Sequence, residues 1–162
     1  MRIEQIEENF KIDIGAPMPT ILSNEYSLYL IFYIRDVDPN WDGKSVKVRN
    51  KKNNGIVTVK FDGFTQYKFG NPNDETIDGH PLYKFGLEPY SIQKVIGSEW
   101  IKELMKMNSV HPAHKDEYFK DYEHFIFFFH DTCLEVVATG YSFEKDSESN
   151  MREEIQRVCK LL

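Results

Sequence analysis

The chain has 162 residues, the length of a single domain, and its 20 basic and 26 acidic side chains give a formal net charge of −6. Apolar residues make up 41% of the chain and aromatic residues 14%, which is enough for a packed core and excludes intrinsic disorder. The acidic balance argues against a nucleic-acid partner, because binding to phosphates requires a cationic surface. We therefore expect one globular domain over residues 1–162.

The first ten residues, MRIEQIEENF, contain no apolar run long enough for a signal peptide or a membrane span. Cys133 and Cys159 are far apart in the chain and do not form a CxxC motif. Free cysteines of this kind are most often small buried side chains. These features favour a cytoplasmic protein with no membrane contact.

Near the N-terminus, Ile3, Ile6 and Phe10 have helical spacing, but residues 15–19, GAPMP, interrupt any regular element there. The pattern predicts a short amphipathic turn or arm, with residues 1–24 as an N-terminal arm of the domain.

Three segments that follow have the pattern of β-strands. Residues 26–35 are apolar on both faces, which is typical of the centre of a sheet. Apolar and polar side chains alternate over residues 45–49 and 57–61, as in half-buried strands. Asn53-Asn54-Gly55 between them predicts a hairpin turn.

Residues 64–69 and 91–96 predict two further strands, separated by a long turn-rich segment. Ser98 is a typical N-cap for a helix that cannot continue past Pro112. The apolar stripe of that helix consists of Trp100, Ile101, Leu104 and Met105.

A second helix is predicted over residues 147–162, capped by Ser147 or Ser149. Glu153 and Arg157 have the spacing of an ion pair on its polar side. Its apolar docking stripe consists of Met151, Ile155, Val158, Cys159 and Leu162.

The clearest pattern is a β-hairpin over residues 123–144, with strand-like runs on either side of His130-Asp131-Thr132-Cys133. Centring the turn on this tetrapeptide places Phe129 opposite Leu134 and Phe128 opposite Glu135. One face is then a core face, made of Phe125, Phe127, Phe129, Leu134, Val136 and Ala138. The reverse face is either a polar-lined cavity or a partly covered surface, and contains His124, Ile126, Phe128, His130, Cys133, Glu135, Val137 and Thr139.

Together these elements predict an α+β fold. We expect a mainly antiparallel, curved sheet of about six or seven strands, with the two helices packed on it.

Few sequence motifs in the chain indicate a particular enzymatic reaction or ligand. GxGxxG, GxxxxGK[ST], HExxH and GxSxG are all absent from the sequence, which removes most support for dinucleotide, P-loop and common hydrolase functions. Residues 36–43 resemble a calcium loop, but an EF-hand needs Gly at its sixth position and Glu at its twelfth, where this chain has Trp41 and Lys47. We favour a turn there, and we expect no metal and no cofactor.

The chain has five histidines, of which His80 and His111 precede prolines in turn-like sequences. His130-Asp131 at the hairpin end and Glu135 on its reverse face form the strongest chemical arrangement. An imidazole and a carboxylate there can orient each other for proton transfer or metal binding. The same residues also fit a purely structural hydrogen bond, so both interpretations stay open.

Strings at these positions resemble a family of small bacterial proteins with no assigned activity. They are KFGNPNDE (68–75), GHPLY (79–83), GLEPY (86–90), SEWI (98–101), NSVHP (108–112) and HFIFFFHDTCLEVVA (124–138). The resemblance covers residues 28–138 and implies a bacterial, cytosolic protein. It draws attention to a candidate ligand or partner surface made of His80, Tyr83, Glu88, Tyr90, Trp100, His111, His130, Asp131 and Glu135.

Two functions from different classes fit the sequence. The first is a non-enzymatic module that binds a protein partner, similar to acidic immunity proteins that neutralise bacterial toxins. An acidic surface suits a cationic toxin site, and aromatic side chains supply interface anchors. The alternative is a small-molecule or metal-dependent enzyme that uses His130 and Glu135, with His80 or His111 supplied by the long loops. We favour the binding module, because the chain is acidic and rich in aromatic residues and lacks the common catalytic motifs. The enzyme predicts one pocket that these side chains share.

Overall fold

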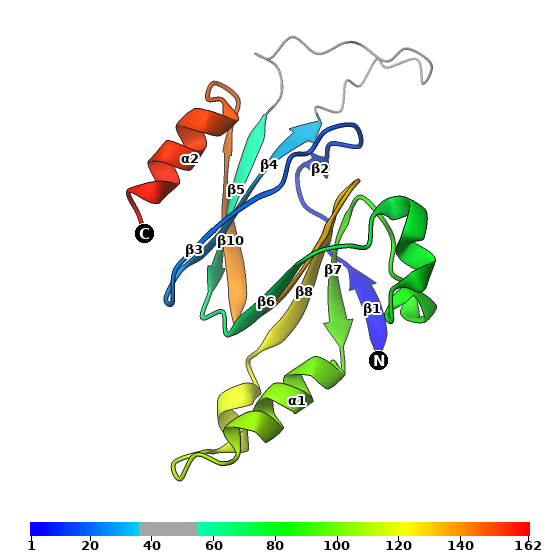
Figure 1. Cartoon of the computed structure of the whole chain (residues 1–162), viewed down its shortest axis with the longest axis vertical. Helices are drawn as coiled ribbons and strands as arrows, with labels where there is room; N and C mark the ends of the chain where they lie inside the picture. Colours follow the sequence, from blue (N-terminus) through cyan, green and yellow to red (C-terminus); the bar gives the residue numbers. More distant parts are fainter. Residues whose placement is uncertain (36–54) are drawn as a thin grey trace.

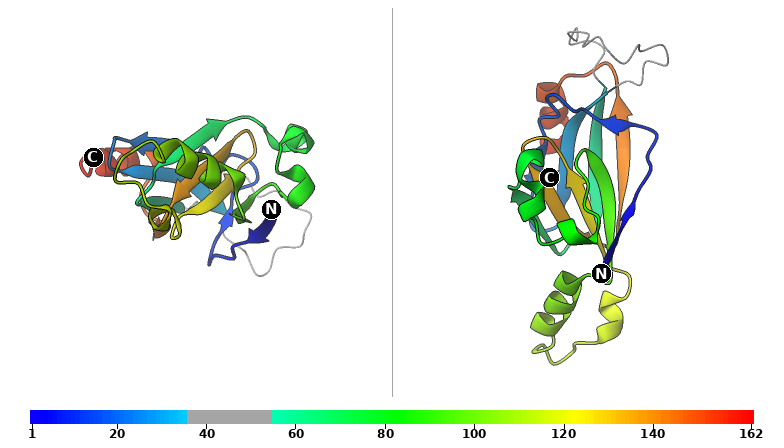
Figure 2. Two further views of the ribbon diagram at one scale, coloured as in Figure 1. Left: turned by 90° about the horizontal axis from the view of Figure 1, so that it is seen from below. Right: turned by 90° about the vertical axis from the view of Figure 1, so that its right-hand side faces the viewer.

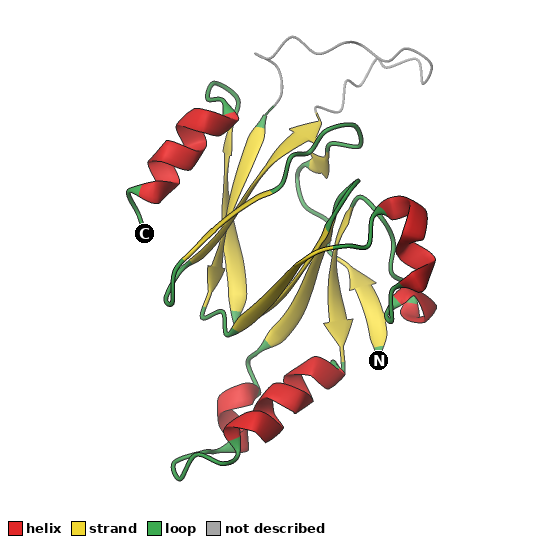
Figure 3. Ribbon diagram, viewed as in Figure 1, coloured by secondary structure: helices red, strands yellow, loops and turns green. Residues whose placement is uncertain are grey.

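The computed structural model of the chain describes residues 1–35 and 55–162 (Figure 1). It has the predicted α+β fold, with two mostly antiparallel, curved sheets and the helices at the periphery (Figure 3). The calcium-like sequence 36–43, the predicted strand 45–49 and Asn53-Asn54 of the predicted turn lie outside the described residues.

Within residues 1–35 and 55–162 the strands are divided between two five-stranded sheets, whereas the sequence predicted a single sheet of about six or seven strands. The β8 sheet has the order β1-β7-β8-β9-β6 and consists of β1 (Arg2–Gln5), β6 (Gln66–Gly70), β7 (Ser91–Ile96), β8 (Glu123–Phe128) and β9 (Cys133–Ala138). The β4 sheet has the order β10-β5-β4-β2, with β3 also paired to β4, and consists of β2 (Lys11–Ile12), β3 (Thr20–Ser23), β4 (Leu28–Arg35), β5 (Ile56–Asp62) and β10 (Gly140–Asp146).

β4 lies at the centre of its sheet, as its two apolar faces predicted. It pairs with β5 along one edge and with β2 and β3 along the other. Leu28, Leu30 and Phe32 point into the core between the sheets, whereas Tyr29 and Ile31 pack on the outer side against α2. Each face therefore buries apolar surface, which explains why the segment has no polar alternation.

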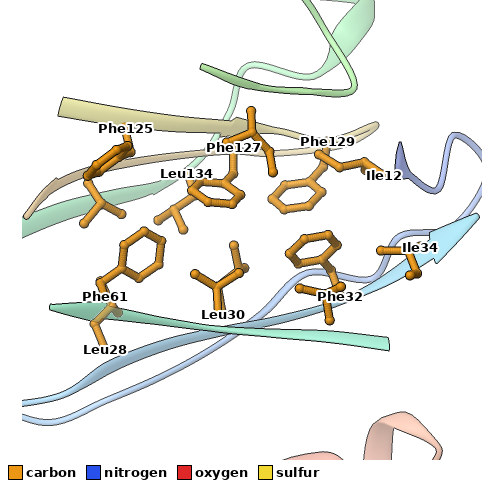
Figure 4. Packing of buried hydrophobic residues seen from close by; sticks show 14 of the residues in the cluster. Ile12, Leu28, Leu30, Phe32, Ile34, Phe61, Phe125, Phe127, Phe129 and Leu134 are labelled. Atoms are coloured by element: carbon orange, nitrogen blue, oxygen red, sulfur yellow. The ribbon is translucent and has the colours of Figure 1, made fainter. Parts of the chain in front are cut away.

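The main core lies between the two sheets, where rows of aromatic and aliphatic side chains face each other (Figure 4). Phe127 of β8 meets Phe61 of β5 with ring centroids 5.5 Å apart, and Phe129 meets Phe32 at 5.2 Å, both edge to face. This geometry is the favourable one for aromatic pairs. All six residues of the predicted core face of the hairpin are buried here: Phe125, Phe127, Phe129, Leu134, Val136 and Ala138.

The helices cover different parts of the sheets. α2 (Met151–Cys159) packs on the outer face of the β4 sheet through Val158, Met151 and Ile155. α1 (Glu99–Asn108) begins after its predicted N-cap, Ser98, and with the 3-10 helix η3 (Asp116–Phe119) extends beyond the ends of the β8-sheet strands (Figure 2). No helix in the described part of the chain is long and apolar enough to cross a membrane.

The hairpin register differs from the sequence prediction by two residues. Phe127, not Phe129, lies opposite Leu134, and Phe128 lies opposite Cys133, not Glu135. The turn is centred on His130-Asp131, because the amide of Phe129 donates to the carbonyl of Thr132 at 2.8 Å. A shift of two residues keeps every side chain on its face, so the predicted division into two faces is correct although the opposed pairs are wrong.

The structure corrects the sequence predictions for two further segments. Residues 2–5, predicted as part of an amphipathic turn or arm, form the edge strand β1, because their backbone pairs with β7. The second strand of the hairpin was predicted to continue to residue 144. In the structure β9 ends at Ala138, and a separate strand, β10, begins at Gly140 and pairs with β5 in the other sheet.

The start of α2 also differs from the prediction. The N-cap is Asn150, whose side chain accepts from the amide of Glu153, and Glu153 in turn accepts from the amide of Asn150 in a capping box. The carboxylate of Glu153 is engaged by the amide of Asn150. Arg157 instead pairs with Glu154 at 2.9 Å and with Glu144 at 3.0 Å. The predicted Glu153–Arg157 ion pair is therefore absent.

Replacing Phe127 by alanine should leave a cavity between the two sheets, because this side chain is fully buried against Phe61 and Phe32. We expect a loss of about 3–5 kcal/mol in the free energy of unfolding, measured by urea denaturation. Tyr26→Ala, at a side chain that is 87% exposed, is the control and should change stability by less than about 0.5 kcal/mol. Equal losses in the two variants would contradict the assignment of the core.

Candidate functional site

The reverse face of the β8–β9 hairpin is covered by residues 71–90, which we name the covering segment. It connects β6 to β7, which lie on opposite sides of the hairpin in the sheet order, and its apolar side chains pack on this face. Its two 3-10 helices are η1 (Asp74–Gly79) and η2 (Tyr83–Phe85). Leu82 and Leu87 pack on Ile126 and Phe128, which makes the face a covered surface with two polar clusters.

The first cluster surrounds the carboxylate of Glu135 on β9, and we name it the Glu135 cluster. Nε2 of His124 on β8 lies 3.0 Å from Oε2, off the line of a linear hydrogen bond. Nε2 of His80 in the covering segment and Nζ of Lys68 on β6 each lie 3.7 Å from Oε1. Three segments that are distant in sequence therefore meet at one buried carboxylate.

Both imidazoles present an N–H to this carboxylate. Nδ1 of His80 accepts from the amide of Leu82 at 3.1 Å. Nδ1 of His124 lies 2.9 Å from the hydroxyl of Ser98, and Nε2 lies 3.0 Å from the Glu135 carboxylate, which can only accept, so the hydroxyl donates to Nδ1. In the neutral rings the proton is therefore on Nε2 in both cases.

This tautomer does not suit a metal. A metal ligand needs the Nε2 lone pair, but here a fixed backbone donor occupies Nδ1 of His80 and leaves the proton on Nε2. In addition, no group of three His, Cys, Asp or Glu side chains among residues 1–35 and 55–162 is arranged to hold a metal ion. The Glu135 cluster instead ties the covering segment to the sheet.

Burial raises the pKa of Glu135, but the neighbouring His124 and His80 and the charge of Lys68 outweigh it and hold the pKa well below its usual value. Glu135 is therefore ionised at neutral pH. Burial also raises the pKa of the Cys133 thiol, so that this cysteine is an unreactive core side chain.

Trp100 supports the same cluster from α1. Its ring meets the edge of His124 at 5.1 Å, its Nε1 donates to Gln66 at 2.8 Å, and Nζ of Lys68 lies 3.8 Å from its centroid. The tryptophan thus joins α1 to β6 and β8, and its role is structural.

The second cluster lies at the hairpin end and contains Asp74, Tyr90 and His130. We name it the His130 cluster. The Tyr90 hydroxyl donates to Oδ2 of Asp74 and lies 2.8 Å from Nδ1 of His130. Nδ1 of His130 also lies 3.1 Å from Oδ2 of Asp74. Since the tyrosine proton is used by Asp74, Nδ1 of His130 has only acceptors around it and carries the ring proton.

The electrostatics of the His130 cluster follow from these contacts. The hydrogen bond to Asp74 raises the pKa of His130, although its partial burial opposes this. Burial and the hydrogen bond to Asp74 raise the pKa of Tyr90 to about 12, and the charges of Asp131 and Glu75 add to the effect. The hydrogen bond from Tyr90 lowers the pKa of Asp74, against the effect of burial.

Tyr90 also has a left-handed backbone, with φ of 54°. Such a conformation is costly for a bulky side chain and is retained where the surroundings impose it. Here it directs the phenol towards Asp74 and His130, with the Tyr90 and His130 rings nearly parallel at 6.1 Å.

The predicted site residues are thus divided between the two clusters or lie outside both. His130 contacts Asp74 and Tyr90, whereas Glu135 lies beside His124, His80 and Lys68. Tyr83 and Asp131 are exposed, His111 accepts from the amide of Ala113 in an exposed turn, and Glu88 accepts from Gln5 at 2.9 Å.

Sequence reasoning missed Asp74, His124 and Lys68 as members of the clusters. His124 was placed on the correct face of the hairpin, but its contact with Glu135 depends on pairing across β8 and β9. Asp74 lies within the string KFGNPNDE, yet nothing local brings it to His130.

Two surface hollows are present elsewhere. The larger one, of about 300 Å³, lies between the end of β7 and the start of α1 and is lined by Lys94, Ile101 and Tyr122 among others. The smaller one, of about 50 Å³, contains Tyr90 at its edge together with residues of β1 and β2. Neither contains His130 or Glu135.

Comparison of the chain with protein-family models, with curated proteins and with solved structures finds no match. The function must therefore be argued from the site, because a fold by itself does not define one.

Glu135→Gln should destabilise the protein, because it removes the negative charge and replaces one of the two oxygens that face His124 and His80 with an NH2 donor. We expect a loss of about 1–3 kcal/mol at neutral pH. Since the folded pKa of Glu135 is depressed, its contribution is present above the unfolded pKa of about 4.3 and is lost as the pH falls further. Urea denaturation across pH should show the difference from wild type shrinking in acid. The exposed Glu103→Gln is the control, and a pH-independent difference at Glu135 would contradict this account.

Proton–nitrogen correlation NMR of the histidine rings should find the neutral proton on Nε2 in His80 and His124 and on Nδ1 in His130. Asp74→Asn should lower the pKa of His130, because the hydrogen bond to Asp74 is the largest cause that raises it. His111, whose Nδ1 accepts from the amide of Ala113, serves as the control histidine. A His130 ring protonated on Nε2 in its neutral form would be incompatible with the assigned contacts.

Proposed function

We propose that the chain is a protein-binding module that recognises a cationic surface of its partner. The recognition surface consists of Asp74, Glu75, Asp78 and Asp131, which we name the acidic surface. The observation that carries the proposal is that the amide of Asp74 donates to the carbonyl of His130 at 2.9 Å, which brings Asp74 and Glu75 of η1 beside Asp131 of the hairpin turn. Carboxylates from separate parts of the chain thus concentrate at one place.

The composition of the covering segment supports this interpretation. Residues 71–90 contain four carboxylates, Asp74, Glu75, Asp78 and Glu88, against one lysine, Lys84. Tyr83 in the same segment is 47% exposed, and exposed tyrosines are frequent anchors in protein interfaces. Clustered charge of one sign attracts an oppositely charged partner and increases the association rate.

An immunity-like role fits these features, since a toxin that binds nucleic acid or other anionic substrates presents a cationic surface. The metal-dependent alternative has less support, because the histidines of the Glu135 cluster present N–H groups to the carboxylate. His130 is hydrogen-bonded to Asp74 and Tyr90, and it lines neither of the two hollows described above.

The test is a capture experiment with three forms of the protein. Wild type, Glu75→Lys/Asp131→Lys and the control Glu103→Lys/Asp121→Lys are immobilised and exposed to a bacterial lysate, and any stoichiometric protein is purified and measured by calorimetry. The control pair changes the net charge by the same amount at exposed positions around α1 and η3. We expect a basic partner that binds wild type and control alike, and the acidic-surface variant at least about tenfold more weakly.

The proposal fails if no protein binds in a 1:1 ratio. It also fails if the partner binds the acidic-surface variant as tightly as wild type.

A further inference from the structure

His130 differs from the other histidines in which nitrogen carries the proton. All five histidines lie in the described part of the chain, and in four of them Nδ1 accepts a hydrogen bond, which leaves the proton on Nε2. The donors are the amide of Leu82 for His80, the amide of Ala113 for His111, Nδ2 of Asn108 for His114 and the hydroxyl of Ser98 for His124. Only His130 has Nδ1 facing acceptors, so only its Nε2 presents a lone pair when the ring is neutral.

His130 has a side chain that is 39% exposed, and its hydrogen bonds and ion pair within the described part of the chain are formed by Nδ1, not by Nε2. The ring is held in place by Asp74 and by the nearly parallel ring of Tyr90. It is therefore an oriented hydrogen-bond acceptor at the surface.

The charges around this acceptor decide what it can bind. Asp74 and Glu75 on η1 and Asp131 in the hairpin turn are the charged groups that act on His130. Three carboxylates disfavour an anion, and a single imidazole lone pair is too few ligands for a structural or catalytic metal. A cationic group with several N–H donors fits both the lone pair and the carboxylates.

We propose that Nε2 of His130 accepts an N–H from an arginine guanidinium of the partner protein, while the neighbouring carboxylates of Glu75 and Asp131 balance its charge. The planar guanidinium suits this arrangement better than an ammonium, because it presents several N–H groups in a fixed fork. This inference rests on the proposed function and names the anchor within the acidic surface.

A consequence is that partner binding depends on pH. A protonated His130 has no lone pair and repels the guanidinium, so the complex favours the neutral ring. Because Asp74 raises the pKa of His130 above its ordinary value of 6.5, affinity should fall as the pH is lowered through a value above 6.5. Aspartate and glutamate do not titrate in this window, since their ordinary pKa values are near 4.

The experiment uses a hexa-arginine peptide as the probe, so that it does not depend on identifying the natural partner. Its affinity is measured by calorimetry at low ionic strength at about pH 8.5 and about pH 5.5, on either side of the histidine pKa. The proteins are wild type, His130→Gln and His111→Gln. Glutamine keeps an acceptor but does not titrate, and His111 is an exposed histidine with its proton on Nε2.

We expect the affinity of wild type and His111→Gln to fall about tenfold between the two pH values, the size of one charge-assisted hydrogen bond. In His130→Gln the change should be less than about twofold. Hexa-lysine should bind more weakly than hexa-arginine at the higher pH.

Three results would overturn the inference: no binding of hexa-arginine to wild type, an unchanged pH dependence in His130→Gln, or equal affinity for the two peptides. None of them would remove a protein partner found with the charge-reversed variants, so the inference and the proposed function fail separately.

Discussion

The alternation of side chains along β8 and β9 is the constraint on which the rest of the molecule depends. It sends Phe125 and Phe127 into the core between the two sheets and places His124 and Glu135 on the opposite face. A slip of one residue would exchange the two faces and bury the charges in the main core. The apolar core therefore determines where the ionisable groups must lie, and the outer face needs partners that satisfy them.

The covering segment supplies these partners because of the sheet topology. β6 and β7 are separated by β9 and β8 in the strand order, and the chain between them packs on the hairpin. In doing so it brings His80 to Glu135 and Asp74 to His130. Its apolar side chains, such as Leu82, complete a second, smaller core on this side. One connection thus creates both polar clusters and the acidic surface.

The hydrogen-bond partner of Nδ1 assigns different roles to histidines of the two clusters. A backbone amide or a serine hydroxyl at Nδ1 turns His80 and His124 into donors that hold Glu135 ionised. A carboxylate at Nδ1 leaves the neutral His130 ring with its lone pair on Nε2, in a side chain that is 39% exposed. The Glu135 cluster therefore ties the covering segment to the sheet, and the His130 cluster is where we propose that a partner binds.

The sequence alone determined the α+β class, the strands 91–96 and 57–61, the start of α1 after Ser98 and the two faces of the hairpin, because each follows from local periodicity or capping. Only the tertiary structure decided the division into two sheets after Ala138, the pairing of Phe127 with Leu134, and the separation of His130 from Glu135. These depend on which distant segments pack together. Local periodicity shows on which face of a strand a side chain lies. Its contact partner depends on the path of a distant segment, as when the covering segment brings Asp74 to His130.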